Sequence, residues 1–233
     1  MNKFIGVAAL LVLSAIGRAS AMDTPPFLPP GTVDLATILP PPPANDSAVT
    51  KAEIAEIHVS QTKATPAEQA QAKADTEEDV YIYANVLGPN LAADKLPVAA
   101  IFFDEVRKSE GEFVDPAKKV FGRPRPPLID PTIVPCQKLS ASGAYPSGHA
   151  TTGYLFAAVL AQMVPEKRTE IFNRAQEYAH NRVLCGVHYP SDLEAGKLSG
   201  TAIAALLQGS PAYKAEFGSA KAELRKVLGM PVQ

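Results

Sequence analysis

The sequence lacks a strong charge of either sign and is poor in the residues that bind metals. Its 22 Lys and Arg residues nearly balance 24 Asp and Glu residues, so the formal net charge at pH 7 is −2. This balance gives no field that would attract nucleic acid or an acidic membrane. The chain has four His and two Cys, and no HExxH, CxxC or clustered carboxylate pattern occurs. We therefore expect neither a nucleic-acid partner nor a metal site.

Long hydrophobic runs are missing after the first 21 residues. Within those residues, Lys3 precedes the apolar run Phe4–Ile16, and the small residues Ala19-Ser20-Ala21 follow. This order is typical of a cleaved signal peptide, and the run is short for a membrane anchor. No later stretch reaches the ~18 apolar residues of a membrane-spanning helix. We expect residues 1–21 to be a signal peptide that directs a protein without spanning segments to the periplasm or the exterior.

The rest of the chain is long enough for one domain with a sizeable core. It begins with a proline-rich arm, residues 22–46, whose prolines at 25–26, 29–30 and 40–43 favour extended polyproline geometry over helix. We expect this arm either to wrap the surface or join subunits, or to be a loose segment. Residues 47–233 are expected to form the domain itself.

Helical signals run through this domain, and the alternating β-branched runs of strands are missing. Residues 50–53 (TKAE) and 65–68 (TPAE) fit capping boxes at two helix starts. The second of these helices is expected to continue to Leu87, where Gly88-Pro89 ends it. Further helices are expected over residues 96–108, 146–164, 166–184, 190–208 and 212–228. The sequence therefore predicts an all-α fold, a compact single-domain multi-helix bundle.

Two short segments suit the binding of a phosphate anion. In KKVFGRPRP, Lys118 offers a point charge and Arg125 a bidentate fork, although basic pairs at helix ends are also common on solvated surfaces. In GAYPSGH, residues Ser147, Gly148 and His149 stand at a helix start, where free N–H groups and the helix dipole attract anions. His149 can also donate a proton near neutral pH, whereas an ordinary cap with an exposed His is the alternative.

A third segment, NRVLCGVHYPSD, supplies a nucleophile. His188 and Asp192 are four residues apart, so one helical turn brings the carboxylate to the imidazole and leaves the other ring nitrogen free to attack. Arg182 adds another fork for phosphate oxygens. Taken alone, the His–Asp pair is equally compatible with a structural contact at a helix start.

Together the three segments resemble, in order and spacing, the signature of the type 2 phosphatidic acid phosphatase superfamily: KxxxxxxRP, PSGH and SRxxxxxHxxxD. The RP pair is Arg125-Pro126, because Arg123-Pro124 would require a Lys at Pro116. More narrowly, the chain is similar to the bacterial class A non-specific acid phosphatases, which share an exported form, an LPPPP-like stretch (residues 39–43) and a GxYPSGH segment. One residue departs from the signature: Asn181 stands where the family has Ser, and it can still donate a hydrogen bond.

The resemblance implies an acid phosphatase that hydrolyses a broad range of small monoesters, such as nucleotides, sugar phosphates and aryl phosphates, through a phosphohistidine. In that scheme His188 attacks phosphorus, Asp192 orients it, and His149 protonates the leaving alcohol and then activates water. Five residues would hold the non-bridging oxygens: Lys118, Arg125, Ser147, Gly148 and Arg182. No cofactor is implied, vanadate would bind as a phosphate mimic, and the intermediate could also pass phosphate to an alcohol.

Three other functions compete with this interpretation. A vanadium-dependent haloperoxidase shares the anion pocket, although those enzymes are usually much longer. A phosphatase acting on lipid phosphates at a membrane surface would fit the same motifs. A phosphate-binding module without turnover would require a broken catalytic position, whereas His149, His188 and Asp192 are all intact. The resemblance and the proline-rich arm are also compatible with a homodimer.

The two cysteines, Cys136 and Cys185, would meet an oxidising environment after export. We expect a disulfide between them rather than two free thiols, and it would connect two phosphate-binding segments. Of the remaining histidines, His58 is expected to be structural, and His180 either structural or at the pocket edge.

Overall fold

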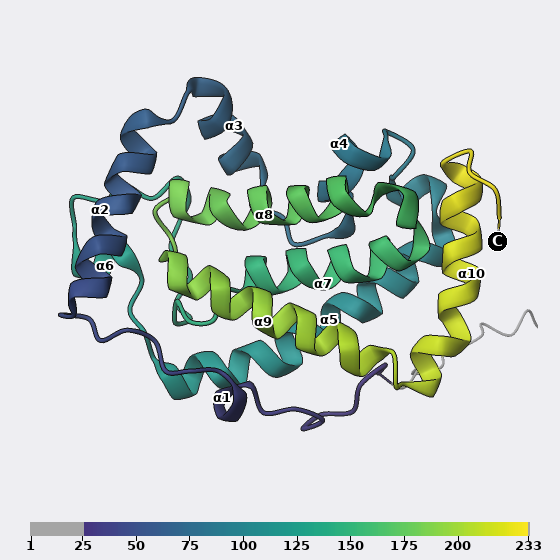
Figure 1. The fold of residues 1–233 in the computed structure, drawn as a ribbon, viewed down its shortest axis with the longest axis horizontal. Helices are drawn as coiled ribbons and strands as arrows, with labels where there is room; N and C mark the ends of the chain where they lie inside the picture. The colour runs from purple at the N-terminus through teal and green to yellow at the C-terminus, as the bar shows by residue number, and fades with distance from the viewer. Residues whose placement is uncertain (1–25, 233) are drawn as a thin grey trace, which may run out of the picture.

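The computed structural model of the protein describes residues 26–232, which form helices joined by loops (Figure 1). No strand occurs in this range, which confirms the predicted all-α fold. The helices are α1 (Leu35–Ile38), α2 (Ala48–Lys63), α3 (Pro66–Ala74), α4 (Ala84–Leu87), α5 (Pro97–Phe121), α6 (Pro126–Ile129), α7 (Gly148–Met163), α8 (Arg168–Leu184), α9 (Pro190–Leu207) and α10 (Pro211–Val227). Three short 3-10 segments are η1 (Val80–Tyr83), η2 (Ala93–Lys95) and η3 (Pro165–Lys167).

The predicted signal peptide, residues 1–21, and residues 22–25 of the arm lie outside the described residues. Over residues 26–232, no helix combines the length and the apolar character that crossing a membrane requires.

Helix α7 is the centre of the bundle, with α8, α9 and α5 packed around it (Figure 1). Nearly all of its residues are buried, because its sequence is apolar on every side. Helix α10 packs mainly against α5 and closes one end of the bundle. The second motif segment lies at the start of α7, and the third leads into α9.

Two glycines on α9 let it approach α7 closely. A Cβ at Gly196 would lie 2.7 Å from the carbonyl oxygen of Ser147, and one at Gly200 would overlap the carbonyl oxygen of Thr151. Only residues without a side chain fit these positions. At the same end, the backbone N–H of Ser147 donates to the carbonyl oxygen of Asp192 at 3.0 Å. The starts of α7 and α9 therefore lie side by side, which brings the second and third motif segments together.

One of the two predicted capping boxes is wrong. Ser47, not Thr50, caps α2: its side chain accepts a hydrogen bond from the backbone N–H of Thr50. Glu53 therefore lies in the second turn of α2, where its carboxylate is 2.8 Å from NH2 of Arg123 in a buried ion pair. The box at residues 65–68 is confirmed, with Pro66 in the first turn of α3.

The predicted extension of the second helix to Leu87 is also wrong. Helix α3 ends at Ala74, because Asp75 leaves the helix to pair with Arg174 of α8, with N–O distances of 2.9 and 2.5 Å. The chain becomes helical again at η1, where the side chain of Asp79 accepts the backbone N–H of Tyr81. A turn over residues 75–79 therefore interrupts what the sequence presents as one helix.

Helix α5 is longer than expected, because it continues past residue 108 through Gly111 and Pro116. Both are poor helix formers. A stripe of buried apolar side chains holds the extended helix against the core: Phe102, Phe103, Val106, Phe113, Val114 and Ala117. The extension places Lys118 near the end of a long, well-packed helix. Each of the last four long helices starts and ends within two residues of its predicted bounds.

The described part of the arm, residues 26–46, runs along the surface of the bundle and includes the short α1 (Figure 1). Four of its apolar side chains are buried: Phe27, Leu28, Leu35 and Leu39. The hydroxyl of Tyr145 donates to the carbonyl oxygen of Pro40 at 2.6 Å, and that of Ser210 donates to the carbonyl oxygen of Phe27 at 2.5 Å. Of the predicted conformations, the structure shows an arm packed on the surface rather than a loose one.

Candidate active site

Residues from all three predicted segments line one cavity of about 370 Å³. It forms where α5, α7 and α9 meet, because Lys118 and Arg125 flank the end of α5, His149 begins α7, and His188 precedes α9. Gly148 lines it as well. The other three predicted site residues are buried but do not line the cavity: Ser147, Arg182 and Asp192.

His188 is held by Asp192, as the four-residue spacing predicts. Nδ1 of the ring lies 3.2 Å from Oδ2 of Asp192, which also accepts the backbone N–H of Tyr189 at 2.9 Å. Nε2 faces Arg125, whose NH1 is 3.1 Å away. Burial, followed by the positive charges of Arg125 and Lys118, holds the pKa of His188 well below its usual value. The ring is therefore neutral, with Nε2 unprotonated, as a nucleophile requires.

Lys118 and Arg125 bring positive charge into the cavity without neutralising it. Nζ of Lys118 donates to the carbonyl oxygen of Gly143 at 3.1 Å. Nε of Arg125 donates to the carbonyl oxygen of Ser142 at 3.2 Å, and NH1 donates to that of Val187 at 3.0 Å. These bonds to neutral groups fix the directions of both side chains. Within residues 26–232 neither cation has an ion-pair partner within 4.0 Å, so the cavity favours an anion.

The start of α7 provides backbone donors. Ser147 is the N-cap, and its buried hydroxyl accepts the backbone N–H of Ala150 at 3.3 Å. The first N–H groups of a helix have no partner within the helix, and Gly148 brings them to the cavity wall. The helix start lies where the PSGH segment predicts it, and anion binding by its N–H groups stays a prediction.

His149 lies in the cavity wall between two acceptors. Its Nδ1 is 2.6 Å from Oε1 of Glu78, and its Nε2 is 3.1 Å from the carbonyl oxygen of Thr76. The ring stacks on Tyr178, with 5.8 Å between centroids. These contacts fix the orientation of the ring in the cavity wall. Sequence reasoning missed Glu78, which is one of several acidic residues in a row (TEED) with no motif to single it out.

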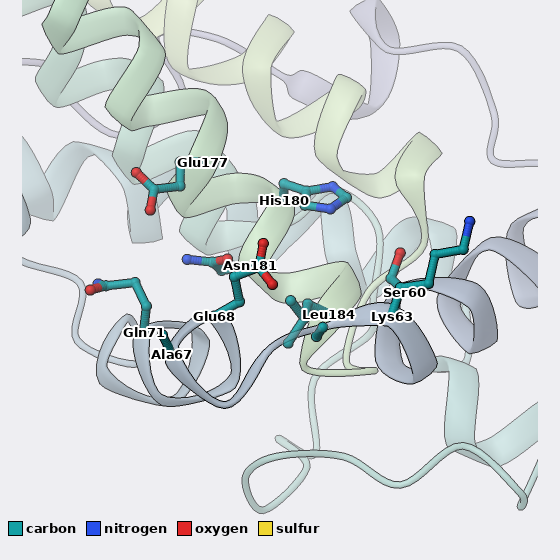
Figure 2. Close-up of a pocket in the computed structure, with 10 residues that line it drawn as sticks. Ser60, Lys63, Ala67, Glu68, Gln71, Glu177, His180, Asn181 and Leu184 are labelled. Carbon is teal, nitrogen blue, oxygen red and sulfur yellow. The ribbon is translucent and has the colours of Figure 1, made fainter.

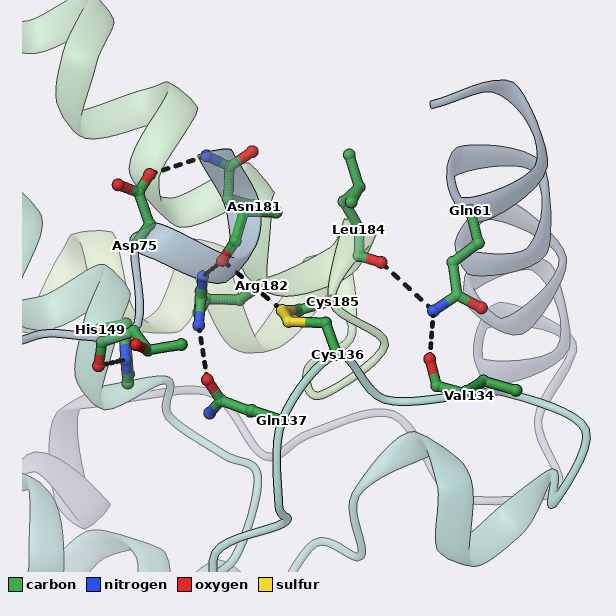
Figure 3. The surroundings of a disulfide bond; sticks show 12 residues. Gln61, Asp75, Val134, Cys136, Gln137, His149, Asn181, Arg182, Leu184 and Cys185 are labelled. Atoms are coloured by element: carbon green, nitrogen blue, oxygen red, sulfur yellow. Dashed lines mark hydrogen bonds between the residues drawn. A yellow bond between two sulfur atoms is a disulfide. The ribbon is translucent and has the colours of Figure 1, made fainter. Parts of the chain in front are cut away.

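Asn181 and Arg182, near the end of α8, contact Asp75 and Gln137 (Figure 3) and do not line the cavity. Arg182 donates to the carbonyl oxygen of Ala72 and, at 3.3 Å, to Oε1 of Gln137. Asn181 donates to Oδ2 of Asp75 at 2.7 Å. The residue that departs from the family's Ser is therefore directed at a buried ion pair, and it does not line the cavity.

Cys136 and Cys185 form a disulfide, as predicted (Figure 3). Their Cα atoms are 4.8 Å apart, and the backbone N–H of Cys136 donates to the carbonyl oxygen of Cys185 at 3.0 Å. Cys136 directly precedes Gln137, whereas Cys185 directly follows α8. The bond therefore ties the loop that contacts Arg182 to the helix that carries Arg182.

Arg123 and Glu53 support the His188–Asp192 pair from outside the cavity, and sequence reasoning missed both. NH1 of Arg123 lies 2.6 Å from Oδ1 of Asp192, and NH2 lies 2.8 Å from Oε2 of Glu53. The guanidinium sits 3.9 Å above the ring of Tyr189. Burial raises the pKa of Asp192, and the charge of Arg123 opposes that shift. Arg123 was missed because the motif spacing assigns a role only to Arg125, the second arginine of the RPRP run.

Two carboxyl groups reach the cavity at the start of α7. A Cβ added to Gly148 would lie 2.9 Å from Oε1 of Glu110 and 3.3 Å from Oε1 of Glu78. Burial and the negative charge of Glu78 raise the pKa of Glu110 to about 8. Sequence reasoning missed Glu110 as well, because the helix was expected to end before it.

A larger cavity, about 540 Å³, lies between the α2–α3 connection and α8 (Figure 2). None of the predicted catalytic or phosphate-binding residues lines it. His180 lines this cavity, together with Lys63 and Glu68, and is absent from the catalytic cavity. Nε2 of His58 lies 2.9 Å from Oδ2 of Asp130 and so ties α2 to the segment after α6, a structural role as expected.

The chain is similar in sequence to known proteins, both in the three motif segments and outside them. A family model described as the PAP2 superfamily matches residues 101–214, which contain all three motif segments. The non-specific acid phosphatase of Salmonella typhi is 32% identical over 215 residues, which cover 88% of this chain and 86% of that protein. The acid phosphatase of Zymomonas mobilis subsp. mobilis is also 32% identical, over 62% of this chain and 56% of its own length.

The fold has a counterpart among solved structures. The crystal structure of a transmembrane PAP2 type phosphatidylglycerolphosphate phosphatase from Bacillus subtilis superposes with a TM-score of 0.51. The superposition covers 75% of this chain and 89% of that one at 17% identity, so it shows a shared fold. The chain therefore belongs to the PAP2 superfamily, within which it is an acid phosphatase.

Proposed function

We propose that the chain hydrolyses small phosphate monoesters through a phosphohistidine on His188. One observation carries the proposal: a buried imidazole, fixed by Asp192, lines the same cavity as Lys118 and Arg125, two cations without an ion-pair partner in the described residues. A histidine in water would be protonated in acid and could not attack. Burial and the neighbouring cations keep this one neutral, which is the property that a histidine nucleophile needs at acid pH.

The two chemical steps use the two histidines in turn. Nε2 of His188 attacks phosphorus in line with the leaving oxygen, so that an N–P bond forms as the ester P–O bond breaks. His149 gives its proton to the leaving alcohol. In the second step His149 takes a proton from water, whose oxygen attacks phosphorus and displaces Nε2. The products are the alcohol and inorganic phosphate, and Asp192 holds Nδ1–H of His188 throughout.

The non-bridging oxygens are assigned to the groups that line the cavity. Lys118, Arg125 and the backbone N–H of Gly148 can reach an anion there directly. Fixed donors in a buried site stabilise the charge of the transition state more strongly than water does. Ser147 and Arg182 act from behind these groups: Ser147 caps the helix start, and the charge of Arg182 helps to lower the pKa of His188. No metal or other cofactor enters the scheme, and vanadate is expected to take the phosphate position.

The cavity suits small polar substrates. Its volume is about 370 Å³, and Val187 is the one large apolar side chain that lines it within the described residues. Nucleotides, sugar phosphates and aryl phosphates therefore fit this lining better than a lipid chain. The phosphohistidine could also pass its phosphate to an alcohol in place of water.

Hydrolysis of a chromogenic phosphate ester by the purified protein, from pH 4 to 8, tests the mechanism. We expect activity that persists in EDTA, falls with vanadate and is abolished in His188→Ala. His58→Ala, a structural histidine away from the cavity, serves as the matched control and should retain activity. Rapid quenching in alkali, in which a phosphohistidine is stable, should trap phosphate on His188, detectable by mass spectrometry. Full activity in His188→Ala would show that another residue is the nucleophile.

Parallel assays separate the competing functions. Lysophosphatidate is expected to be a poorer substrate than a nucleotide, and a clear preference for the lipid would overturn the proposed substrate class. The vanadate-loaded protein is expected not to oxidise halide. Halide oxidation without ester hydrolysis would identify a haloperoxidase.

We also propose that the protein is exported and that residues 1–21 are removed. The support is the N-terminal pattern of charge, apolar run and small residues, together with a disulfide that persists best in an oxidising compartment. The mass of the protein isolated from the periplasm or medium should correspond to a chain that begins at Met22. Retention of the full chain in the cytoplasm would contradict export.

A further inference from the structure

Glu110 is a buried carboxyl group in the catalytic cavity that the proposed mechanism does not use. It lies on α5, about two turns before Lys118, and is 9% exposed. Within residues 26–232, no hydrogen-bond donor and no cation contacts its carboxyl oxygens. Its carboxyl group lines the cavity, so a ligand bound there or a proton can supply the missing partner. The position of Glu110 allows both.

The carboxyl group of Glu110 lies where the phosphate is expected. Its Oε1 would be 2.9 Å from a Cβ on Gly148, the residue whose backbone N–H we assign to a non-bridging oxygen. An ionised carboxylate beside this helix start would repel an oxyanion. A carboxylic acid would instead present an O–H donor to it.

The surrounding charges favour the neutral form. Glu78, in the turn after α3, places its carboxyl group near that of Glu110. The same carboxyl group of Glu78 contacts the ring of His149 on α7. On α5 itself three charged residues act on Glu110: Arg107, Asp115 and Lys118. Burial and Glu78 outweigh the cations and raise the pKa of Glu110 to about 8, so the side chain is protonated in acid and at neutral pH.

We propose that Glu110 recognises phosphate as a carboxylic acid, by donating its O–H to a non-bridging oxygen at the start of α7. The inference rests on the proposed phosphatase function and deepens it by adding a recognition residue. When Glu110 loses its proton, the donor becomes a repelling charge. Anion affinity therefore falls as the pH rises through the pKa of Glu110.

Binding of inorganic sulfate, measured by calorimetry at pH 6 and pH 9, tests this inference. Sulfate is a tetrahedral dianion at both values, so any proton linkage belongs to the protein. Glu110→Gln keeps the shape and a permanent N–H donor, and we expect it to match the wild type at pH 6. At pH 9 about a tenth of the wild-type molecules keep Glu110 protonated, so the wild-type Kd should exceed that of Glu110→Gln by about tenfold.

A second variant tests whether the side chain at position 110 donates a hydrogen bond to the anion or only lies near it. Glu110→Met has similar length and no hydrogen-bond donor, so its sulfate Kd at pH 6 should be about tenfold or more above that of Glu110→Gln. The matched control, Glu112→Gln, changes an exposed carboxylate on the same helix and should follow the wild type at both pH values. Unfolding midpoints of all variants confirm that folded proteins are compared.

The outcomes distinguish this inference from the proposed function. Equal pH dependence in wild type and Glu110→Gln, or equal affinity of the Gln and Met variants at pH 6, would overturn the role of Glu110 and leave phosphatase activity standing. If neither variant folds, uptake of about one proton when the wild type binds sulfate at pH 9 supports the role, and no uptake overturns it. Absence of ester hydrolysis in the wild type would overturn the proposed function, whereas proton-linked sulfate binding would still be observed.

Discussion

Arg123 and Asp192 form a buried ion pair, with 2.6 Å between NH1 and Oδ1, while the other oxygen of the same carboxylate faces Nδ1 of His188. A single carboxylate thus links a fixed cation outside the cavity to His188, the proposed nucleophile, inside it. Glu53 and the ring of Tyr189 hold the guanidinium in turn. This arrangement makes Arg123 a positioning residue that acts through Asp192.

Replacing Arg123 by Met is expected to lower kcat by about 100-fold with little change in KM, because a small displacement of Asp192 turns Nε2 of His188 away from phosphorus. The measurement is kcat and KM for a chromogenic ester, normalised to the folded fraction. Arg225→Met is the matched control, since Arg225 is equally buried and pairs with Glu166 at 2.7 Å, outside the cavity. Both variants should lose stability, but Arg225→Met should keep its kcat. An equal fall in kcat in both would mean that Arg123 acts only through stability.

Glu78 is expected to matter most when the leaving group is poor. Its carboxylate lies 2.6 Å from Nδ1 of His149, so Glu78→Gln should weaken proton donation by that ring. Hydrolysis of an alkyl phosphate should therefore fall at least tenfold more than hydrolysis of a nitrophenyl phosphate, whose leaving group needs little protonation. Glu77→Gln, which changes the exposed neighbouring carboxylate, should leave both rates unchanged. A uniform loss across leaving groups would exclude this role for Glu78.

The motif segments, the helical class and the disulfide could be predicted because each depends on residues close in sequence or on chemistry that needs particular residue types. His188 and Asp192 are four residues apart, and a local turn suffices to join them. The carboxyl groups that complete the site could not be predicted in this way. Glu53, Glu78 and Glu110 reach it from three separate segments, and only tertiary packing brings them there.

The errors in helix boundaries have the same origin. Asp75 reads as a helical residue from its neighbours, yet its carboxylate is drawn into a buried ion pair with Arg174, far along the chain. The helix expected to end at residue 108 continues through Gly111 and Pro116, because the apolar stripe of α5 outweighs their low helix propensity. Tertiary contacts decided each of these positions.

The close contact between α7 and α9 can be tested with two glycines. Gly200→Ala would place a Cβ against the carbonyl oxygen of Thr151, so we expect a loss of about 1–3 kcal/mol in the free energy of unfolding and a parallel loss of activity as α9 shifts. Gly218→Ala on α10 meets nothing within 4 Å and should add about 0.5–1 kcal/mol. Urea unfolding of both variants measures the difference. A neutral Gly200→Ala would show that the helices separate without penalty.

Glu110 should also leave a signature in the pH dependence of stability. Its pKa is raised from 4.5 in the unfolded chain to about 8 in the folded protein, so its favourable contribution is fully present below pH 4.5 and is lost as the pH rises toward 8. We therefore expect the wild type to lose stability between pH 5 and pH 8 while Glu110→Gln does not. The unfolding free energy of Glu110→Gln minus that of the wild type should rise by on the order of a few kcal/mol over this range and level off above pH 8. Urea unfolding at pH 5, 6.5, 8 and 9 measures this difference, with Glu112→Gln as a control whose difference should stay flat. A constant difference for Glu110→Gln would mean that the carboxyl group ionises normally in the folded protein, and the acid form that we assign to phosphate recognition would then be absent near neutral pH.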